Sequence, residues 1–268
     1  MVKNLKIAII GLGVVGKALH EYFEGKAEIA VYDINNGTFN SEAQKEIVNK
    51  CDFAFICVPT PRKEDDSCDI STVEGVVSWL KTPLIIIKST VEPGTTDRLK
   101  EKYNKKIIFS PEYTSESKYY NPIMRKIEHH PFMILGGTEE EVGMIKDTFV
   151  EISGPLVEIF SCSAKEAELI KYFENTFFAV KVGFSNEMRE ICERAGVDYH
   201  KVRYGWLLDP RINKMHTLAF KSSRGYSGKC LPKDRAAINA WCKKKLNYKP
   251  PIIDAAGEWD LEKKKLDK

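Results

Sequence analysis

The sequence predicts an α/β protein in which a doubly wound parallel sheet is followed by an all-helical domain. Up to about residue 160, short apolar runs alternate with charged, helix-compatible stretches, as in parallel strands joined by helices. Beyond Ser161, apolar residues recur at helical spacing. We therefore expect residues 1–160 to form the sheet domain and residues 161–268 to form a helical domain.

The elements follow in order along the chain. The expected strands are Lys6–Ile10, Ile29–Tyr32, Phe53–Val58, Leu84–Ile87, Ile107–Phe109 and Phe132–Gly136. A helix follows, because Ser163 and Glu166 have the spacing of a capping box. Gly196 directly follows Ala195 and is a stop signal, which gives a helix of about thirty residues.

One face of this helix combines polar and apolar side chains. Lys171 and Asn175 are four residues apart, and the same stripe continues through Phe178 and Val182. The spacing alone leaves two readings open, a polar pair on a largely buried stripe and an ordinary, partly exposed face.

The first expected strand leads directly into the turn Gly11-Leu-Gly-Val-Val-Gly16, a dinucleotide-binding fingerprint. Gly11 allows a tight turn, Gly13 lets a pyrophosphate approach the backbone, and Gly16 lets helix and strand pack closely. Val15 lies in the same turn, and Asp33 ends the second strand. A carboxylate there accepts hydrogen bonds from the adenosine ribose and repels a 2′-phosphate, so we expect a Rossmann-type domain that binds NAD rather than NADP.

A second motif lies near the other end of the chain. Residues 225–234 set Cys230 in a Gly-rich loop with Lys229, Lys233 and Asp234. Nearby cations favour a thiolate, and glycines let backbone N–H groups approach a bound oxygen. Cys230 is therefore a candidate nucleophile, and the alternative is a loop cysteine that lies between two lysines by chance.

Composition indicates a cytoplasmic protein. The net charge of +3, with lysines mixed among acidic residues, gives no argument for nucleic acid. No apolar run approaches the ~20 residues that span a membrane, so no membrane partner is expected. Seven cysteines without a C-x-x-C pair predict neither a disulfide framework nor a metal site.

Five further segments, in order along the chain, resemble motifs of the nucleotide-sugar dehydrogenase family, whose best-known members oxidise UDP-glucose. The segments are Cys57–Pro61 with Asp69–Ser71, Ser89–Thr95, Ser110–Glu116, Lys171–Asn175 and Asp209–Ile212. The resemblance implies a four-electron oxidation of UDP-glucose to UDP-glucuronate with two NAD, through a thiohemiacetal and a thioester on Cys230.

The resemblance also assigns roles to other residues. Lys171 and Asn175 would stabilise the oxyanions, and Lys171 would also act as a base. The residues that position water would be Asp234, Thr90 and Glu116. The residues that bind the substrate would be Glu112, Glu116, Lys171, Asn175, Arg211 and Ser227. Outside the Gly-rich turn, the residues that contact the cofactor would be Thr60, Thr90 and Lys233.

Three local departures and one in length set this chain apart from the family pattern. Ser227 stands where a glycine is usual, the interval from Arg211 to Cys230 is longer, and a basic residue after Asp33 is missing. The chain is also shorter than typical members, which have a further nucleotide-binding domain. We expect a natural short form that forms a homodimer, with the apolar stripe of the long helix as interface.

Two alternative functions remain open. A 3-hydroxyacid dehydrogenase-like enzyme fits the short length and also uses a helix lysine, although it has no use for Cys230 or Asp234. The other alternative is an inactive nucleotide-binding or assembly subunit, against which the presence of Cys230, Lys171, Asn175 and Asp234 speaks.

Overall fold

The computed structural model describes residues 5–114, 126–220, 224–226, 228 and 230–266. Two of the expected site residues, Glu116 and Ser227, lie outside the described residues. The chain divides into two compact units. Unit 1 comprises Met1–Pro61 and Cys68–Lys171, and unit 2 comprises Arg62–Ser67 and Tyr172–Lys268.

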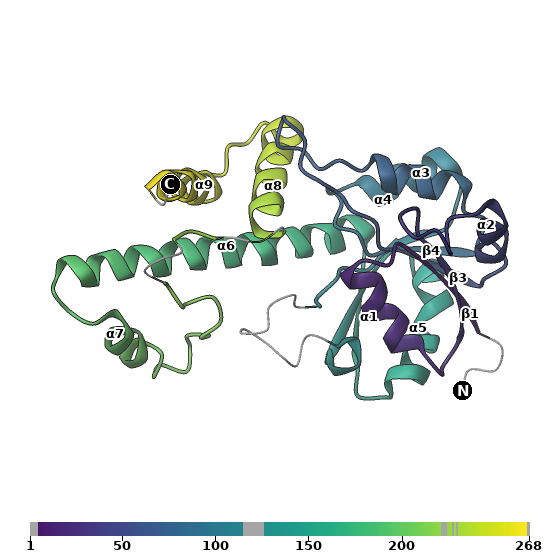
Figure 1. Cartoon of the computed structure of the whole chain (residues 1–268), viewed down its shortest axis with the longest axis horizontal. Helices are drawn as coiled ribbons and strands as arrows, with labels where there is room; N and C mark the ends of the chain where they lie inside the picture. Colours follow the sequence, from purple (N-terminus) through teal and green to yellow (C-terminus); the bar gives the residue numbers. More distant parts are fainter. Residues whose placement is uncertain (1–4, 115–125, 221–223, 227, 229, 267–268) are drawn as a thin grey trace. The chain divides into compact units, whose positions relative to one another are not determined.

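Unit 1 is an α/β unit in which strands and helices alternate (Figure 1). Its strands are β1 (Lys6–Ile10), β2 (Glu28–Tyr32), β3 (Phe53–Ile56), β4 (Leu84–Ile87), β5 (Ile107–Phe109), β6 (Phe132–Gly136) and β7 (Glu158–Cys162). Its helices are α1 (Val14–Phe23), α2 (Glu42–Val48), α3 (Ser71–Trp79), α4 (Thr95–Tyr103), the 3₁₀ turn η2 (Ile127–His129) and α5 (Glu139–Ser153).

The strands form one sheet in the order β2-β1-β3-β4-β5-β6-β7. The expected doubly wound sheet is confirmed, since the five strands β1 to β5 are parallel to one another and β7 is parallel to β6. The parallel prediction is wrong for β6, which is antiparallel to β5. A parallel return needs a crossover helix, and the described part of this connection contains only the 3₁₀ turn.

The sequence prediction missed β7. This strand lies at the edge of the sheet, and its residues are exposed or half-buried. An edge strand with Glu158 and Ser161 among its five residues lacks the continuous apolar run by which buried strands are recognised.

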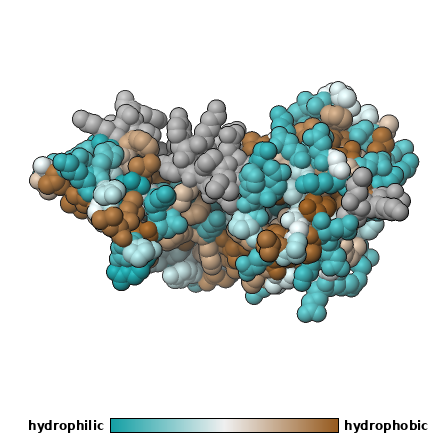
Figure 2. Space-filling model, turned by 90° about the horizontal axis from the view of Figure 1, so that it is seen from below, coloured by the Kyte–Doolittle hydropathy of each residue, from teal (hydrophilic) through white to brown (hydrophobic). Residues whose placement is uncertain are grey.

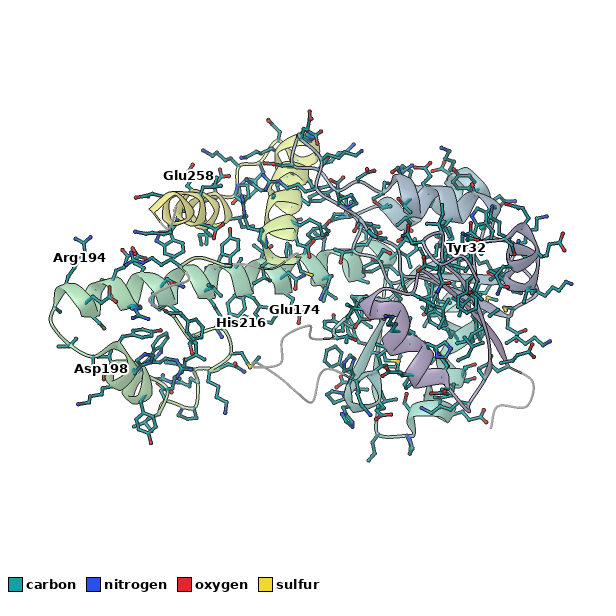
Figure 3. All side chains as sticks on the ribbon, in the orientation of Figure 1. Tyr32, Glu174, Arg194, Asp198, His216 and Glu258 are labelled. Carbon is teal, nitrogen blue, oxygen red and sulfur yellow. The ribbon has the colours of Figure 1, made fainter. Side chains whose placement is uncertain are left out.

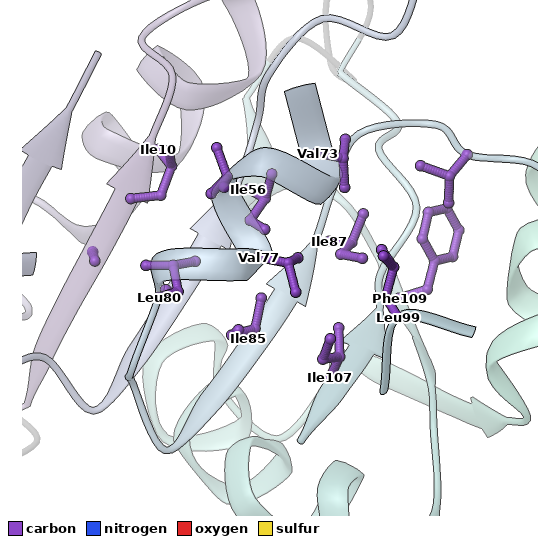
Figure 4. Close-up of a cluster of buried hydrophobic side chains, with 14 of the residues drawn as sticks. Ile10, Ile56, Val73, Val77, Leu80, Ile85, Ile87, Leu99, Ile107 and Phe109 are labelled. Atoms are coloured by element: carbon purple, nitrogen blue, oxygen red, sulfur yellow. The ribbon is translucent and has the colours of Figure 1, made fainter. Parts of the chain in front are cut away.

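The core of unit 1 lies on both faces of the sheet. On one face, side chains of α2, α3 and α4 pack on Ala54, Ile56, Ile85 and Ile87 (Figure 4). On the other face, α1 and α5 pack on the alternate residues of the same strands. Because successive side chains of a strand point to opposite faces, β3 and β4 are buried throughout.

Unit 2 is helical in its described part (Figure 1). Its helices are α6 (Ala164–Arg194), whose first two turns belong to unit 1, α7 (Tyr199–Trp206), α8 (Cys230–Leu246) and α9 (Pro251–Leu266).

The expected limits of the long helix are confirmed. Helix α6 has 31 residues, and the Ser163 N–H donates to Glu166 Oε2 at 2.8 Å while the Glu166 N–H donates to Ser163 Oγ at 3.3 Å. Gly196 follows the helix with a φ of +70°, and its N–H donates to the Glu193 carbonyl. A left-handed residue at this place is the usual end of a helix.

Two glycine substitutions should therefore have opposite effects on stability. Gly196→Ala should lower the free energy of unfolding by about 1 kcal/mol, because a Cβ is strained at positive φ. Gly143→Ala, inside α5 with open space around its Cβ position, should raise stability by about 0.5–1 kcal/mol. Thermal unfolding followed by circular dichroism measures both, and a stabilised Gly196→Ala would contradict this account.

Candidate functional site

The Gly-rich turn after β1 has two glycines that close packing requires and a third with open space around it. Gly11 has a φ of +94°, and a Cβ on it would lie 2.8 Å from the Cys57 carbonyl oxygen. A Cβ on Gly16 would lie 1.9 Å from the Gly11 carbonyl oxygen. No atom lies within 4 Å of the Cβ position of Gly13. The backbone at Gly13 is thus accessible, as the approach of a pyrophosphate requires.

Asp33 lies directly beside this turn. Its Oδ2 accepts a hydrogen bond from the Leu12 N–H at 2.6 Å, and its Oδ1 accepts one from the Asn35 N–H at 2.8 Å. Val15 is half-buried and packs against the core under α1. The residues present therefore fit a dinucleotide, with phosphates at the α1 N-terminus and a ribose at Asp33.

The position of the turn in the sheet agrees with this fit. The chain runs from β1 to the outer strand β2 and returns on the other side of β1 as β3. Ligands of open α/β sheets bind where the strand order reverses in this way, at the carboxyl ends of the strands.

Two further loops at the same edge of the sheet are bonded together. After β3 and β4, Thr60 Oγ1 donates to the Thr90 carbonyl at 2.8 Å, and Ser89 Oγ donates to the Val58 carbonyl at 2.7 Å. The Cys68 N–H donates to Glu92 Oε1 at 2.9 Å. The expected cofactor-side residues Thr60 and Thr90 are therefore fixed relative to each other.

Lys88, which the sequence analysis did not single out, lies at the carboxyl end of β4. Its Nζ donates to the Pro111 carbonyl at 3.0 Å and to Ser110 Oγ at 3.3 Å. Burial lowers the pKa of Lys88, against the opposing effect of the Glu112 carboxylate. The sequence does contain a signal for Lys88. It is a charged residue that directly follows a fully buried strand and precedes Ser89.

Glu112 and Lys171 lie near this ammonium group. Burial raises the pKa of the Glu112 carboxyl, but Lys88, the hydrogen bond from Thr114 N–H and Lys171 together hold it below its usual value. The Lys171 Nζ lies 4.8 Å from the centre of the Tyr113 ring. A cavity of about 20 Å³, lined by Lys88 and Glu112 among others, has room for about one water molecule. Two ammonium groups and a carboxylate thus meet near the carboxyl ends of β4 and β5.

Glu168 is a second residue that the sequence analysis missed. It is fully buried, one turn before Lys171 on α6, and its carboxylate binds the N-terminus of α4. The signal was indirect: the N-cap of α4 is Gly94, which has no side chain to accept from the first N–H groups. Such a helix end requires an acceptor from elsewhere.

Unit 2 brings three of the expected residues together at the start of α8. Asp234 is 1% exposed, and its Oδ2 accepts from Asn175 Nδ2 at 2.6 Å while its Oδ1 accepts from Lys233 Nζ at 2.5 Å. Cys230 is the first residue of α8 and is exposed. A helix start presents unpaired N–H groups, which suit an oxyanion.

The loop that leads to Cys230 is held by α9. The buried Tyr226 N–H donates to Asp260 Oδ1 at 3.0 Å, and the Tyr226 hydroxyl donates to the Ala256 carbonyl at 3.4 Å. Gly225 and Gly228 have φ values of +80° and +88°, a conformation that other residues adopt with strain. The glycines therefore serve the turn, and Asp260 fixes it to the helix.

Arg211 lies on the connection between α7 and α8. Its side chain is exposed and pairs with Asp209, Nε to Oδ1 at 2.9 Å and Nη2 to Oδ2 at 2.5 Å.

One face of α6 packs against other parts of the chain, and the opposite face carries exposed apolar side chains. Phe178, on the face with Lys171 and Asn175, stacks on His216 at 4.1 Å between ring centres, and burial lowers the pKa of His216 to about 4. Figure 3 labels His216 beside α6. This face is thus covered by the chain itself, which corrects the expectation that it is the uncovered one. The exposed apolar side chains lie on the opposite face, two residues further along: Phe173, Phe177, Phe184 and Ile191.

Within the described residues, no helix combines the length and the apolarity needed to cross a bilayer.

Two family profiles match the chain. Residues 23–152 match the NAD binding domain of the UDP-glucose/GDP-mannose dehydrogenase family, and residues 165–260 match its central domain. The expected cofactor, NAD, is confirmed by the first of these matches.

One curated relative and two solved structures show the extent of the similarity. A putative UDP-glucose 6-dehydrogenase of Bacillus subtilis is 32% identical over 246 residues, which are 85% of this chain and 54% of that protein. The chain thus spans about half the length of this relative. The structure of a UDP-glucose dehydrogenase from Pyrobaculum islandicum superposes with a TM-score of 0.81 and 24% identity, over 97% of this chain and 68% of that one.

A second solved structure shares the fold at lower identity. The 3-hydroxyisobutyrate dehydrogenase of Mycobacterium tuberculosis superposes with a TM-score of 0.67 and 15% identity, over 95% of this chain and 92% of that one. Fold alone therefore does not separate the two kinds of dehydrogenase.

Alanine at two glycines of the turn should separate folding from cofactor binding. Gly16→Ala should lower the melting temperature strongly, because its Cβ meets a backbone oxygen at 1.9 Å. Gly13→Ala should leave the melting temperature unchanged and weaken NAD at least about tenfold, since the new methyl group occupies the open approach. Calorimetric titration with NAD measures the affinity, and unchanged affinity in Gly13→Ala would contradict the assignment.

Proposed function

The chain belongs to the UDP-glucose/GDP-mannose dehydrogenase family, and on that premise we propose that it oxidises UDP-glucose to UDP-glucuronate with two NAD. The observation that carries this proposal is the arrangement at the start of α8, where Asp234 binds Asn175 and Lys233 a few residues from the exposed Cys230. NAD, when bound, takes up one hydride in each of the two oxidations. The Asp33 carboxylate favours NAD over NADP.

The first oxidation converts the primary alcohol to an aldehyde. Lys171 takes up the hydroxyl proton, and its ammonium group stabilises the oxyanion. Glu112, held in its ionised form beside Lys88 and Lys171, orients the sugar. Thr90 and Glu116 position water, and Arg211 and Ser227 bind the nucleotide sugar.

The second oxidation proceeds on Cys230. Its thiolate adds to the aldehyde carbon to form a thiohemiacetal, loss of a hydride gives a thioester, and water releases the carboxylate and restores the thiol. Asn175 Nδ2 carries two N–H groups, of which one donates to Asp234, so the second can donate to the oxyanion at each tetrahedral stage. Asp234 fixes that amide and aids the attacking water.

The alternative enzyme is a two-electron dehydrogenase of the 3-hydroxyacid type, a class whose fold is also similar to that of this chain. Such an enzyme has no catalytic role for Cys230 or for the buried Asp234. An inactive nucleotide-binding subunit is the third reading, and it leaves the same residues unexplained.

We also propose that the protein is a cytoplasmic homodimer. Phe173, Phe177 and Phe184 are 57%, 59% and 48% exposed on one face of α6. Figure 2 shows hydrophobic groups, in brown, among hydrophilic ones on the face of the molecule in view. An aromatic stripe of this length on one helix is typical of an interface, and a second copy would present the same stripe. None of the seven cysteines forms a disulfide in this structure, in keeping with a reducing compartment.

The stoichiometry of NADH tests the proposed reaction. We expect two NADH for each UDP-glucose consumed, and UDP-glucuronate as the product by mass spectrometry. One NADH with a 3-hydroxyacid as substrate would support the alternative enzyme, and no turnover with either would support the inactive subunit.

Cys230→Ser extends this test to single steps. The variant should still form the aldehyde, because the first oxidation depends on Lys171 rather than on the thiol, and then stall, since serine is a much weaker nucleophile at neutral pH. We expect a burst of about one NADH for each site with steady turnover lowered at least about 10³-fold. Lys171→Ala should suppress the burst itself, and full turnover by the serine variant would rule out the thioester.

The dimer is tested by one charge on the aromatic stripe. Phe177→Glu should produce a monomer in light scattering at micromolar concentration, because each copy would bury a carboxylate in the interface. Leu156→Glu is the matched control, since Leu156 is 95% exposed and lies outside α6, and it should leave the mass unchanged. A monomeric parent protein would contradict the proposal.

A further inference from the structure

The N-terminus of α4 is capped by a side chain from a distant part of unit 1. Glu168 Oε2 accepts from the Gly94 N–H at 2.5 Å, and Glu168 Oε1 accepts from the Thr96 N–H at 2.8 Å and from Thr96 Oγ1 at 2.6 Å. Gly94, the N-cap of α4, and Thr96 both lie more than seventy positions before Glu168. A carboxylate also complements the positive end of the helix dipole.

Helix α6 is held in place at the same point. A Cβ on Gly136 of β6 would lie 2.5 Å from the Cβ of Ala167 and 3.0 Å from the Cα of Ala164. The first turns of α6 therefore pack directly on the backbone of β6. Glu168, in this close-packed stretch, is 0% exposed, and Lys171 follows one turn later.

The capped helix end is continuous with the loop that carries Thr90. Residues 88–94 connect β4 to α4, and the Thr95 N–H closes their last turn by donating to the Glu92 carbonyl at 3.0 Å. Thr90 in this loop accepts from Thr60. A shift of the α4 N-terminus would thus be transmitted to Thr90 through only a few residues.

We propose that Glu168 is a positioning residue that fixes the loop carrying Thr90 relative to the helix carrying Lys171. These hydrogen bonds join α6 directly to the α4 N-terminus. The inference rests on the proposed function for its catalytic consequence, because Thr90 and Lys171 act there on the same substrate.

The charge of Glu168 provides a readout that a structural role alone would not give. Burial raises the pKa of Glu168 to about 7, and Asp97 of α4 acts in the same direction, against the hydrogen bonds from Thr96 and Gly94. The ionised form can accept all three donors, whereas a protonated carboxyl turns one O–H toward them. The loop is therefore best fixed above about pH 7.

Stability depends on pH in the opposite direction. A carboxyl whose pKa is raised in the folded state stabilises the fold below its unfolded pKa, and this contribution is lost as pH rises through about 7. Glutamine mimics the protonated carboxyl and does not titrate. Relative to the parent, Glu168→Gln should therefore become more stable with rising pH while its activity deficit increases.

The experiment compares Glu168→Gln with the parent between pH 5 and pH 8.5. We expect kcat to be lowered at least about tenfold at pH 8, with the ratio of parent to variant kcat approaching one near pH 5, and the affinity for NAD within about twofold. The melting temperature of the variant relative to the parent should rise by several degrees over the same range. A constant kcat ratio across this range, or stability and activity falling together, would overturn the proposal.

Glu166→Gln is the matched control. Glu166 lies on the same first turns of α6 but caps only Ser163, at the exposed start of the helix, and its substitution should leave kcat unchanged. An equal loss of kcat in both variants would mean that removing either carboxylate from the first turns of α6 lowers activity, whether or not it binds α4. The proposal would then be wrong.

Hydrogen exchange separates this inference from the proposed function. At pH 8, the backbone N–H groups of residues 91–92 and 94–96 should exchange at least about tenfold faster in Glu168→Gln than in the parent, and Glu166→Gln should match the parent. If the parent turns over no nucleotide sugar, the proposed function fails, and faster exchange still supports the positioning by Glu168. Equal exchange in all three proteins overturns it.

Discussion

The structure depends on carboxylates that satisfy buried donors from distant parts of the chain. Glu168 binds the α4 N-terminus, Asp234 binds Asn175 and Lys233, and Asp260 binds the Tyr226 N–H. An N–H group or ammonium buried without an acceptor destabilises a protein by about 1–3 kcal/mol or more. Each of these carboxylates therefore fixes one loop or helix end, and the loops that carry the candidate site residues are among them.

Helix α6 carries two of the candidate site residues, Lys171 and Asn175. Its first turns belong to unit 1, where Lys171 lies near Glu112, and its remainder belongs to unit 2, where Asn175 binds Asp234. Residues four apart on one helix have a fixed spacing of about one turn. Each unit thus supplies the groups that orient its own residue of this helix.

Buried charge near the site carries a cost in stability. Burial lowers the pKa of Lys88, and burial raises the pKa of Glu168 to about 7. Such shifts mean that burial away from water disfavours the charged form of each group. Groups of this kind gather at functional sites, where a defined charge and position matter more than the stability of the fold.

The sequence by itself determined the six strands with central or strongly apolar patterns, the limits of α6 and the Gly-rich turn after β1, because each depends on local spacing, capping or glycine chemistry. It did not reveal β7, an exposed edge strand, or the antiparallel β6. Glu168 and Lys88 were also decided only by the tertiary structure, since their partners lie 72 and 22 residues away along the chain. Hydrophobic periodicity shows which face of an element is buried, but the hydrogen-bond partner of a buried charge is set by how distant elements pack.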